Sequence, residues 1–65
     1  MTKRIKEGAL LRTFGSVSSY RVGESARSPG TIEITQFGAS LGEYSPEDAR
    51  KLADILVRAA SLMDR

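Results

Sequence analysis

The sequence predicts an α+β fold, a three- or four-stranded antiparallel meander with one C-terminal helix packed across one of its faces. Residues 45–65 repeat apolar side chains at helical spacing, and residues 9–44 form short apolar or alternating stretches broken by glycine-containing turns. A chain of 65 residues is one domain at most. One helix laid on one small sheet is the most economical way to bury a single apolar helix stripe.

The helix is predicted over residues 45–65, and its start is specified chemically. Ser45 is placed to be the N-cap, and Pro46 in the first helical position has no N–H that needs a partner. Asp48 completes a sequence like a capping box, and Glu47 and Asp48 also complement the positive end of the helix dipole. We therefore interpret these two carboxylates as capping groups and not as a metal pair.

The predicted helix has three faces. One apolar stripe is suited to covering the sheet and consists of Ala49, Leu52, Ala53, Leu56, Ala60 and Met63. The opposite face is charged or polar, is expected to be solvated, and carries Glu47, Arg50, Lys51, Asp54, Arg58 and Ser61. Beside the stripe lies a second apolar row, which predicts a homodimer interface formed by Ile55, Ala59 and Leu62.

Two hairpins are expected ahead of the helix. In the first, an apolar run at residues 9–14 is followed by Gly15-Ser16, which suits a two-residue turn, and by a second strand at residues 17–22. An alternative is a short helix over residues 2–11, which Gly8 weakens but does not exclude.

The second hairpin is predicted from a clean alternation over residues 31–36. Ile32 and Ile34 are expected to face inward, and Thr31, Glu33 and Thr35 outward. Phe37-Gly38 offers a turn or a bulge before a last strand at residues 39–44.

These elements give one domain over residues 1–65. It comprises a basic arm at 1–8, strands within 9–44 and the helix at 45–65. Residues 23–30 contain two glycines and one proline, and they are predicted to form a flexible loop that is either a connector or a binding element.

Positive charge is concentrated in the first part of the chain. Residues 1–27 hold six basic and two acidic side chains, a net charge of +4, whereas residues 28–65 hold four basic and six acidic ones, a net charge of −2. This polarity predicts a surface that binds phosphates or an acidic protein, formed by Lys3, Arg4, Lys6, Arg12, Arg21 and Arg27.

Composition argues against several function classes. With no cysteine and no histidine, the chain can form neither a disulfide nor an ordinary zinc site, and no cofactor is expected. No phosphate cradle or dinucleotide fingerprint occurs, and the acidic residues do not form a catalytic pair, so we predict that the chain is not an enzyme. No stretch is long and apolar enough to cross a bilayer, and a cytoplasmic location without membrane contact is expected.

One resemblance starts at the last strand. The stretch 41–53, Leu-Gly-Glu-Tyr-Ser-Pro-Glu-Asp-Ala-Arg-Lys-Leu-Ala, continues to Leu56 and the pair Ala59-Ala60. It resembles the ending of small, mostly uncharacterised proteins of actinobacteria and of their phages and plasmids, in which a strand precedes Ser/Thr-Pro-Glu-x-Ala-Arg-x-Leu-Ala. The resemblance transfers no functional residue. It implies an accessory protein of a mobile element, many of which act by occupying a host protein or nucleic acid.

Three functions are consistent with the sequence. The preferred one is a homodimeric, non-enzymatic phage or mobile-element factor that binds or inhibits a host protein. The second is a small nucleic-acid-binding regulator that uses the basic N-terminal half. The third is a protein that sequesters a small anionic ligand between subunits, with contacts from Arg12, Arg21 and Arg27.

Overall fold

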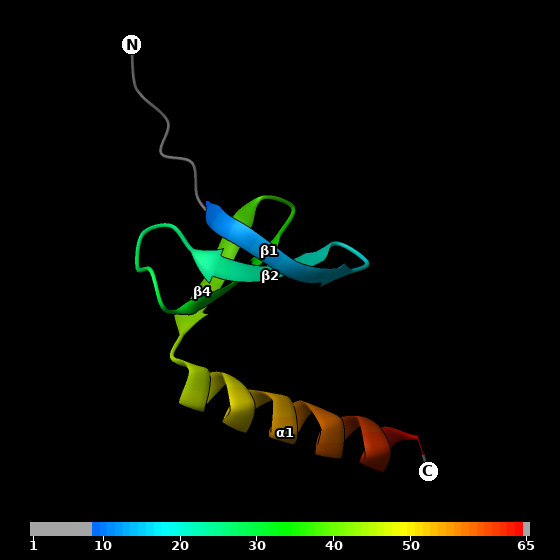
Figure 1. Cartoon of the computed structure of the whole chain (residues 1–65). Helices are drawn as coiled ribbons and strands as arrows, with labels where there is room; N and C mark the ends of the chain where they lie inside the picture. The colour runs from blue at the N-terminus through cyan, green and yellow to red at the C-terminus, as the bar shows by residue number, and fades with distance from the viewer. Residues whose placement is uncertain (1–8, 65) are drawn as a thin grey trace.

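The computed structural model describes residues 9–64, which form one antiparallel sheet followed by one helix (Figure 1). The elements are β1 (Leu10–Val17), β2 (Tyr20–Ser25), β3 (Ile32–Gln36), β4 (Ala39–Tyr44) and α1 (Pro46–Met63). The strand order in the sheet is β1-β2-β3-β4, so each strand pairs with its neighbour in sequence. The predicted α+β meander with one C-terminal helix is confirmed. The basic arm at 1–8 lies outside the described residues, and so does most of the alternative helix at 2–11.

The first hairpin turns at Ser18-Ser19, so the predicted turn at Gly15-Ser16 is wrong. Ser18 has a φ of 55° as the first central residue, which is the pattern of a type II′ turn. Gly15 instead lies inside β1, directly after Phe14, where the register with β2 shifts by one extra residue. A glycine inside a strand often marks such a bulge, and this explains why its turn signal was misleading.

The loop between the hairpins is also shorter than predicted, because β2 runs to Ser25. Gly23 pairs with Glu33 of β3 and is buried. A side chain at Gly23 would collide with the carbonyl oxygen of Arg12 on β1. Gly23 is therefore required for the close approach of two strands, and the loop itself covers residues 26–31.

The second hairpin follows the prediction closely. Phe37 and Gly38 are the two central residues of its turn, and their φ angles of 53° and 83° match a type I′ turn. Leu41 is an extra residue in β4, since Ile34 pairs with Gly42 and Thr35 with Ser40.

The sheet has two chemically different faces, because directly paired residues on neighbouring strands point to the same side. The polar sheet face carries one large apolar residue, Leu10, at its edge and otherwise includes Thr13, Ser16, Arg21, Ser25, Glu33, Thr35, Ser40 and Glu43. The apolar sheet face includes Val17, Tyr20, Val22, Ile32, Ile34 and Tyr44.

Burial of these faces is the reverse of what the alternation predicts. Glu33 and Thr35, expected to face solvent, are 0% and 4% exposed, whereas Ile32 and Ile34 are half-buried. Glu33 is covered because the loop after β2 brings Arg27 over the polar sheet face. Among residues 9–64, no large apolar side chain is fully buried.

The helix begins as predicted. Ser45 has an extended backbone, and its Oγ accepts a hydrogen bond of 3.0 Å from the backbone N–H of Asp48. Two ion pairs at i,i+4 spacing follow along the charged face, Glu47 with Lys51 at 3.6 Å and Asp54 with Arg58 at 3.5 Å. Helix α1 ends at Met63.

The packing of α1 on the sheet is much less extensive than predicted. The helix meets the sheet chiefly at β4, where Ala49 and Leu52 are half-buried, and the side chains from residue 53 to 64 are exposed. One residue, Ser45, connects β4 to α1, and the helix leads away from the sheet (Figure 1). Connections between strands and helices usually have two to six residues, and with this shorter one α1 covers little of its own sheet. Within the described residues, no helix combines the length and the apolar composition needed to span a membrane.

Candidate functional site

The structure does not gather the arginines predicted to bind a partner into one patch. Arg12 pairs with Glu24, whose neighbour on β3 is Ile32, and so it lies on the side of the apolar sheet face. Arg21 pairs with Thr35 and lies on the polar sheet face. Arg27 belongs to the loop after β2. The other three predicted residues, Lys3, Arg4 and Lys6, lie outside the described part of the chain.

Arg12 already has partners within its own hairpin. Its Nε lies 3.1 Å from Oε1 of Glu24, and its guanidinium lies 5.1 Å from the centre of the Phe14 ring. The second oxygen of Glu24 accepts a hydrogen bond of 2.9 Å from the backbone N–H of Gly30. Arg12 therefore joins β1 to β2, although 69% of its side chain remains exposed.

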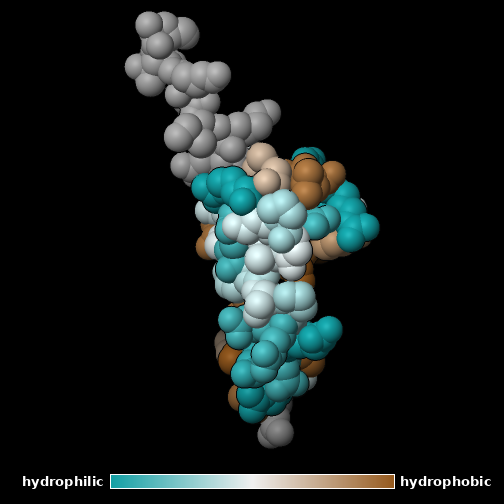
Figure 2. All heavy atoms as spheres, turned by 60° about the vertical axis from the view of Figure 1, so that its left-hand side comes forward, coloured by the Kyte–Doolittle hydropathy of each residue, from teal (hydrophilic) through white to brown (hydrophobic). Residues whose placement is uncertain are grey.

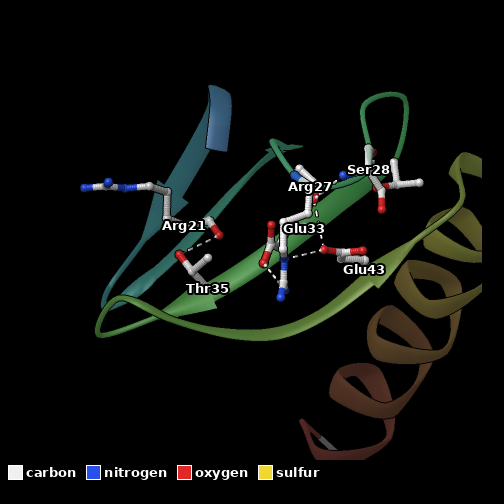
Figure 3. A network of polar contacts seen from close by, with 8 residues as sticks. Arg21, Arg27, Ser28, Glu33, Thr35 and Glu43 are labelled. Carbon is white, nitrogen blue, oxygen red and sulfur yellow. Dashed lines mark hydrogen bonds and ion pairs between the residues drawn. The ribbon is translucent and has the colours of Figure 1, made fainter. Parts of the chain in front are cut away.

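Arg27 is the centre of a polar cluster over the sheet (Figure 3). Its Nη2 lies 3.4 Å from Oε2 of Glu33, and its Nε lies 3.2 Å from Oε2 of Glu43. Glu33 and Glu43 are direct partners on β3 and β4, where two like charges destabilise a sheet. The guanidinium between them removes this repulsion. We call Ser25, Arg27, Glu33 and Glu43 the Arg27 cluster.

Ser25 connects the cluster to the loop. Its hydroxyl donates a hydrogen bond of 2.9 Å to Glu43 and accepts bonds of 3.2 Å from the backbone N–H groups of Arg27 and Ser28. A further bond of 3.0 Å runs from the N–H of Ser25 to the carbonyl of Thr31 across the loop. Ser25 is fully buried, so these bonds are made without competition from water.

The Arg27 cluster is built to hold the loop, and its chemistry is that of a structural ion-pair network. Both carboxylates are engaged by the same guanidinium, and the Ser25 hydroxyl that contacts Glu43 is fully buried and also accepts two backbone N–H groups of the loop. One atom, Oε1 of Glu33, is buried and has no hydrogen-bond partner in the described structure. Residues 9–64 contain no group of three or more acidic, histidine or cysteine side chains arranged to hold a metal.

Apolar surface is the most prominent feature of the described chain. Eleven large apolar side chains are exposed, and five of them are on the helix: Ile55, Leu56, Val57, Leu62 and Met63. The others are distributed over the strands and turns: Leu11, Phe14, Val17, Tyr20, Phe37 and Leu41. Figure 2 shows brown apolar side chains at the surface of both the sheet region and the helix.

Comparisons with protein-family models, with curated proteins and with solved structures found no match to this chain.

The predicted homodimer row is accessible in the single chain. Ile55 and Leu62 are 54% and 65% exposed, and Ala59 between them is also exposed. These three side chains are free to contact another protein surface.

Sequence reasoning missed the Arg27 cluster and the exposed turn residue Phe37. Glu33 was interpreted as a solvated residue because it occupies a polar position in an alternating strand. A weak signal was present, since Ser25 and Arg27 sit in the loop that must cross over one end of that strand. Phe37 was assigned only a role in the turn, although 85% of its surface is exposed to solvent.

Proposed function

We propose that this chain is a non-enzymatic binding protein that works as a homodimer and occupies a protein partner. The observation that supports it is the exposure of apolar side chains on both the sheet and the helix, with none of the large ones fully buried in residues 9–64. On the helix, five large apolar side chains are exposed within nine residues, and a cluster of apolar surface on one element is typical of a protein interaction site. On the resemblance of its C-terminal part, we place it among phage or mobile-element accessory factors that inhibit a host protein.

The energetics favour a protein partner. Fully burying a Val, Leu, Ile, Phe or Met side chain contributes about 1.5–3 kcal/mol. In the helix, Leu56, Leu62 and Met63 are 59%, 65% and 83% exposed, so most of this contribution is not realised in the single chain. A small domain of this size is marginally stable, and association with another protein supplies the missing burial.

The alternatives have less support from the geometry. A nucleic-acid surface needs several cations on one face, whereas Arg12 and Arg21 lie on opposite sides of the sheet and Arg12 and Arg27 already hold carboxylates. The same arrangement disfavours an anion site formed by these three arginines. Nucleic-acid binding through the arm at residues 1–8 would be distinguished from protein binding by its sensitivity to nuclease and to salt.

The experiment is affinity capture from lysate of an actinobacterial host, with and without nuclease. The bait is the full chain, and we expect one host protein to be retained after nuclease treatment and at raised salt. Phosphate contacts would instead give an affinity that falls steeply with ionic strength. Loss of the captured partner upon nuclease treatment would contradict the proposal.

Two matched variants make the capture specific. Leu62→Glu places a charge in the exposed apolar row and should abolish capture, whereas Arg50→Glu changes the charged helix face and should leave it intact. Equal capture by both variants would show that the apolar row is not the binding surface. Light scattering on the same samples tests the homodimer directly.

A further inference from the structure

Two uncovered apolar surfaces in this chain have matching sizes. Helix α1 has 18 residues and is therefore about 27 Å long. Strands of five to eight residues span about 17–26 Å, and four strands are about 14 Å across. The apolar stripe of α1 can thus cover the apolar sheet face from end to end, as one helix does in a two-layer α+β domain.

The connection between these two surfaces disfavours a full contact between them within one chain. Ser45 is extended, with φ of −66° and ψ of 159°, and Pro46 fixes the next φ. A helix that returns over its own sheet normally needs a loop of two to six residues, and one residue is too short. The hydrogen bond from the Asp48 N–H to the Ser45 side chain further fixes the direction in which α1 leaves β4.

The result is visible in the burial of the helix stripe. Ala49 and Leu52, next to β4, are half-buried, while Leu56 and Met63 farther along the same stripe are 59% and 83% exposed. On the sheet, Val17 and Tyr20 are 69% and 40% exposed. Most of the helix stripe therefore has no sheet face against it, and the far end of the apolar sheet face has no helix against it.

We propose that two copies of this chain exchange helices, so that the apolar stripe of each α1 covers the apolar sheet face of the partner subunit. This inference rests on the proposed homodimer and specifies its geometry. A short connection that disfavours the closed monomer favours such exchange, and a two-fold axis makes both contacts equivalent. The second apolar row, Ile55, Ala59 and Leu62, then remains available at the axis or for the partner protein.

The helix exchange forms the same apolar contact twice. The exposed large side chains on the two surfaces are Val17, Tyr20, Leu56 and Met63 in each chain, and the two-fold axis covers all eight of them in the dimer. A second copy of the chain carries both surfaces, so each helix stripe in the dimer has one sheet face to cover. An unrelated protein would have to reproduce both a helix stripe and a sheet face to cover the same two surfaces.

The decisive measurement is an isotope-filtered NOE experiment on a mixture of labelled and unlabelled full-length chains. We expect intermolecular NOEs between the methyl groups of Leu56 on α1 and those of Val22 and Ile34 on the apolar sheet face. If these NOEs were intramolecular, the helix would close on its own sheet and the inference would be wrong. A dimer whose intermolecular NOEs join only the two helices would overturn the exchange while leaving the homodimer intact. A monomer in light scattering would overturn both.

A pair of variants gives an independent readout. Leu56→Glu should raise the dimer dissociation constant by about 30-fold or more, the effect of losing an interface hot spot, and shift the mass toward the 7.1 kDa of one chain. Arg50→Glu, on the charged face, should change the constant by no more than about threefold. Should Leu56→Glu fail to fold, the corresponding variant Ile34→Glu can be mixed with it. In that heterodimer, the unchanged helix of the Ile34→Glu chain can still cover the unchanged sheet face of the Leu56→Glu chain. Recovery of folded heterodimer would therefore support the exchange, and no recovery would argue against it.

Discussion

At the scale of single residues, the fold depends on the charge of Glu33, which lies at a strand position that the alternating sequence predicts to be exposed to solvent. Glu33 is fully buried, and its charge is balanced by Arg27, whose own side chain is 53% exposed. Removing one partner of a buried ion pair leaves the other charge uncompensated, which costs more than the pair contributes.

Arg27→Ala should therefore lower the free energy of unfolding by about 2 kcal/mol, below the usual range for buried pairs because the guanidinium is partly solvated. Glu33→Gln in the same chain should recover most of this loss, since an amide needs no counter-charge. The measurement is a double-mutant cycle by chemical denaturation.

Arg21→Ala is the matched control, because Arg21 makes no ion pair with any residue in 9–64 and should change stability by no more than about 0.5 kcal/mol. Equal losses for the two arginine variants would contradict a specific role for Arg27.

A second residue-scale feature is the turn residue Phe37. It has a φ of 53°, a conformation that is costly for a bulky side chain, and 85% of it is exposed. In a type I′ turn the favoured sequence is Asn-Gly, and here Gly38 is already present.

Phe37→Asn should accordingly raise the free energy of unfolding by about 0.5–1 kcal/mol, because it relieves strain and exposes no core. Thermal denaturation at one fixed protein concentration measures it, and Gly38→Ala, at a φ of 83°, should have the opposite effect. A loss of stability in Phe37→Asn would mean that this aromatic ring is buried by a partner in the assembled protein.

At the scale of elements, the helix is the part of the chain with the most complete chemical specification. The Ser45 side chain accepts the Asp48 N–H at 3.0 Å, as the capping sequence predicts. Ser45→Ala should cost about 1 kcal/mol and lower the melting temperature by several degrees. Ser61→Ala provides the control, since it removes an exposed hydroxyl in the last turn of α1, far from the cap, and introduces a better helix former. If the two variants had the same melting temperature, the Ser45 cap would contribute nothing to stability.

The elements also show what sequence could and could not predict. The start of α1, the last strand at Ala39–Tyr44 and the turn at Phe37-Gly38 depend on local chemistry, and each was predicted correctly. Gly15 and Gly23 were misread because a glycine that permits a bulge or a close approach between strands looks, in sequence, like one that permits a turn.

The burial of Glu33 could not be predicted for a different reason. It depends on where a loop residue, Arg27, lies after two hairpins have formed, and no local pattern encodes that contact. The same holds for the limited packing of α1, because amphipathic spacing indicates that a stripe will be covered but not which copy of the chain covers it.

At the scale of the whole molecule, the proposed homodimer would couple stability to assembly. Most of the half-buried large apolar side chains form a thin layer on one side of the sheet: Val22, Ile32, Ile34, Tyr44 and Leu52. Leu10, which pairs with Ser25, is half-buried on the other side. In the proposed homodimer, a 65-residue chain with this little burial would gain much of its stability from association, so its melting temperature should rise with protein concentration.

The length of the connection at Ser45 should control that association. Inserting Gly-Ser-Gly-Ser between Tyr44 and Ser45 supplies the residues that α1 needs to fold back over its own sheet. The closed contact would then form within one chain, where a short flexible linker provides an effective concentration on the order of millimolar, and the dimer loses its advantage. We expect the dimer dissociation constant to rise at least about tenfold, measured by light scattering across a dilution series.

The matched control is the same insertion between Pro29 and Gly30, in the loop at residues 26–31, which lengthens the chain equally but leaves the connection to α1 unchanged. That variant loses loop hydrogen bonds made by Gly30 and Thr31 and is expected to be less stable, but under conditions where it is folded it should dimerise as the original chain does, because its connection to α1 is unchanged. If the insertion at Ser45 left the dimer equally tight, the short connection would not be what keeps α1 from its own sheet, and the contact between copies would have to lie on the helix row of Ile55, Ala59 and Leu62 alone.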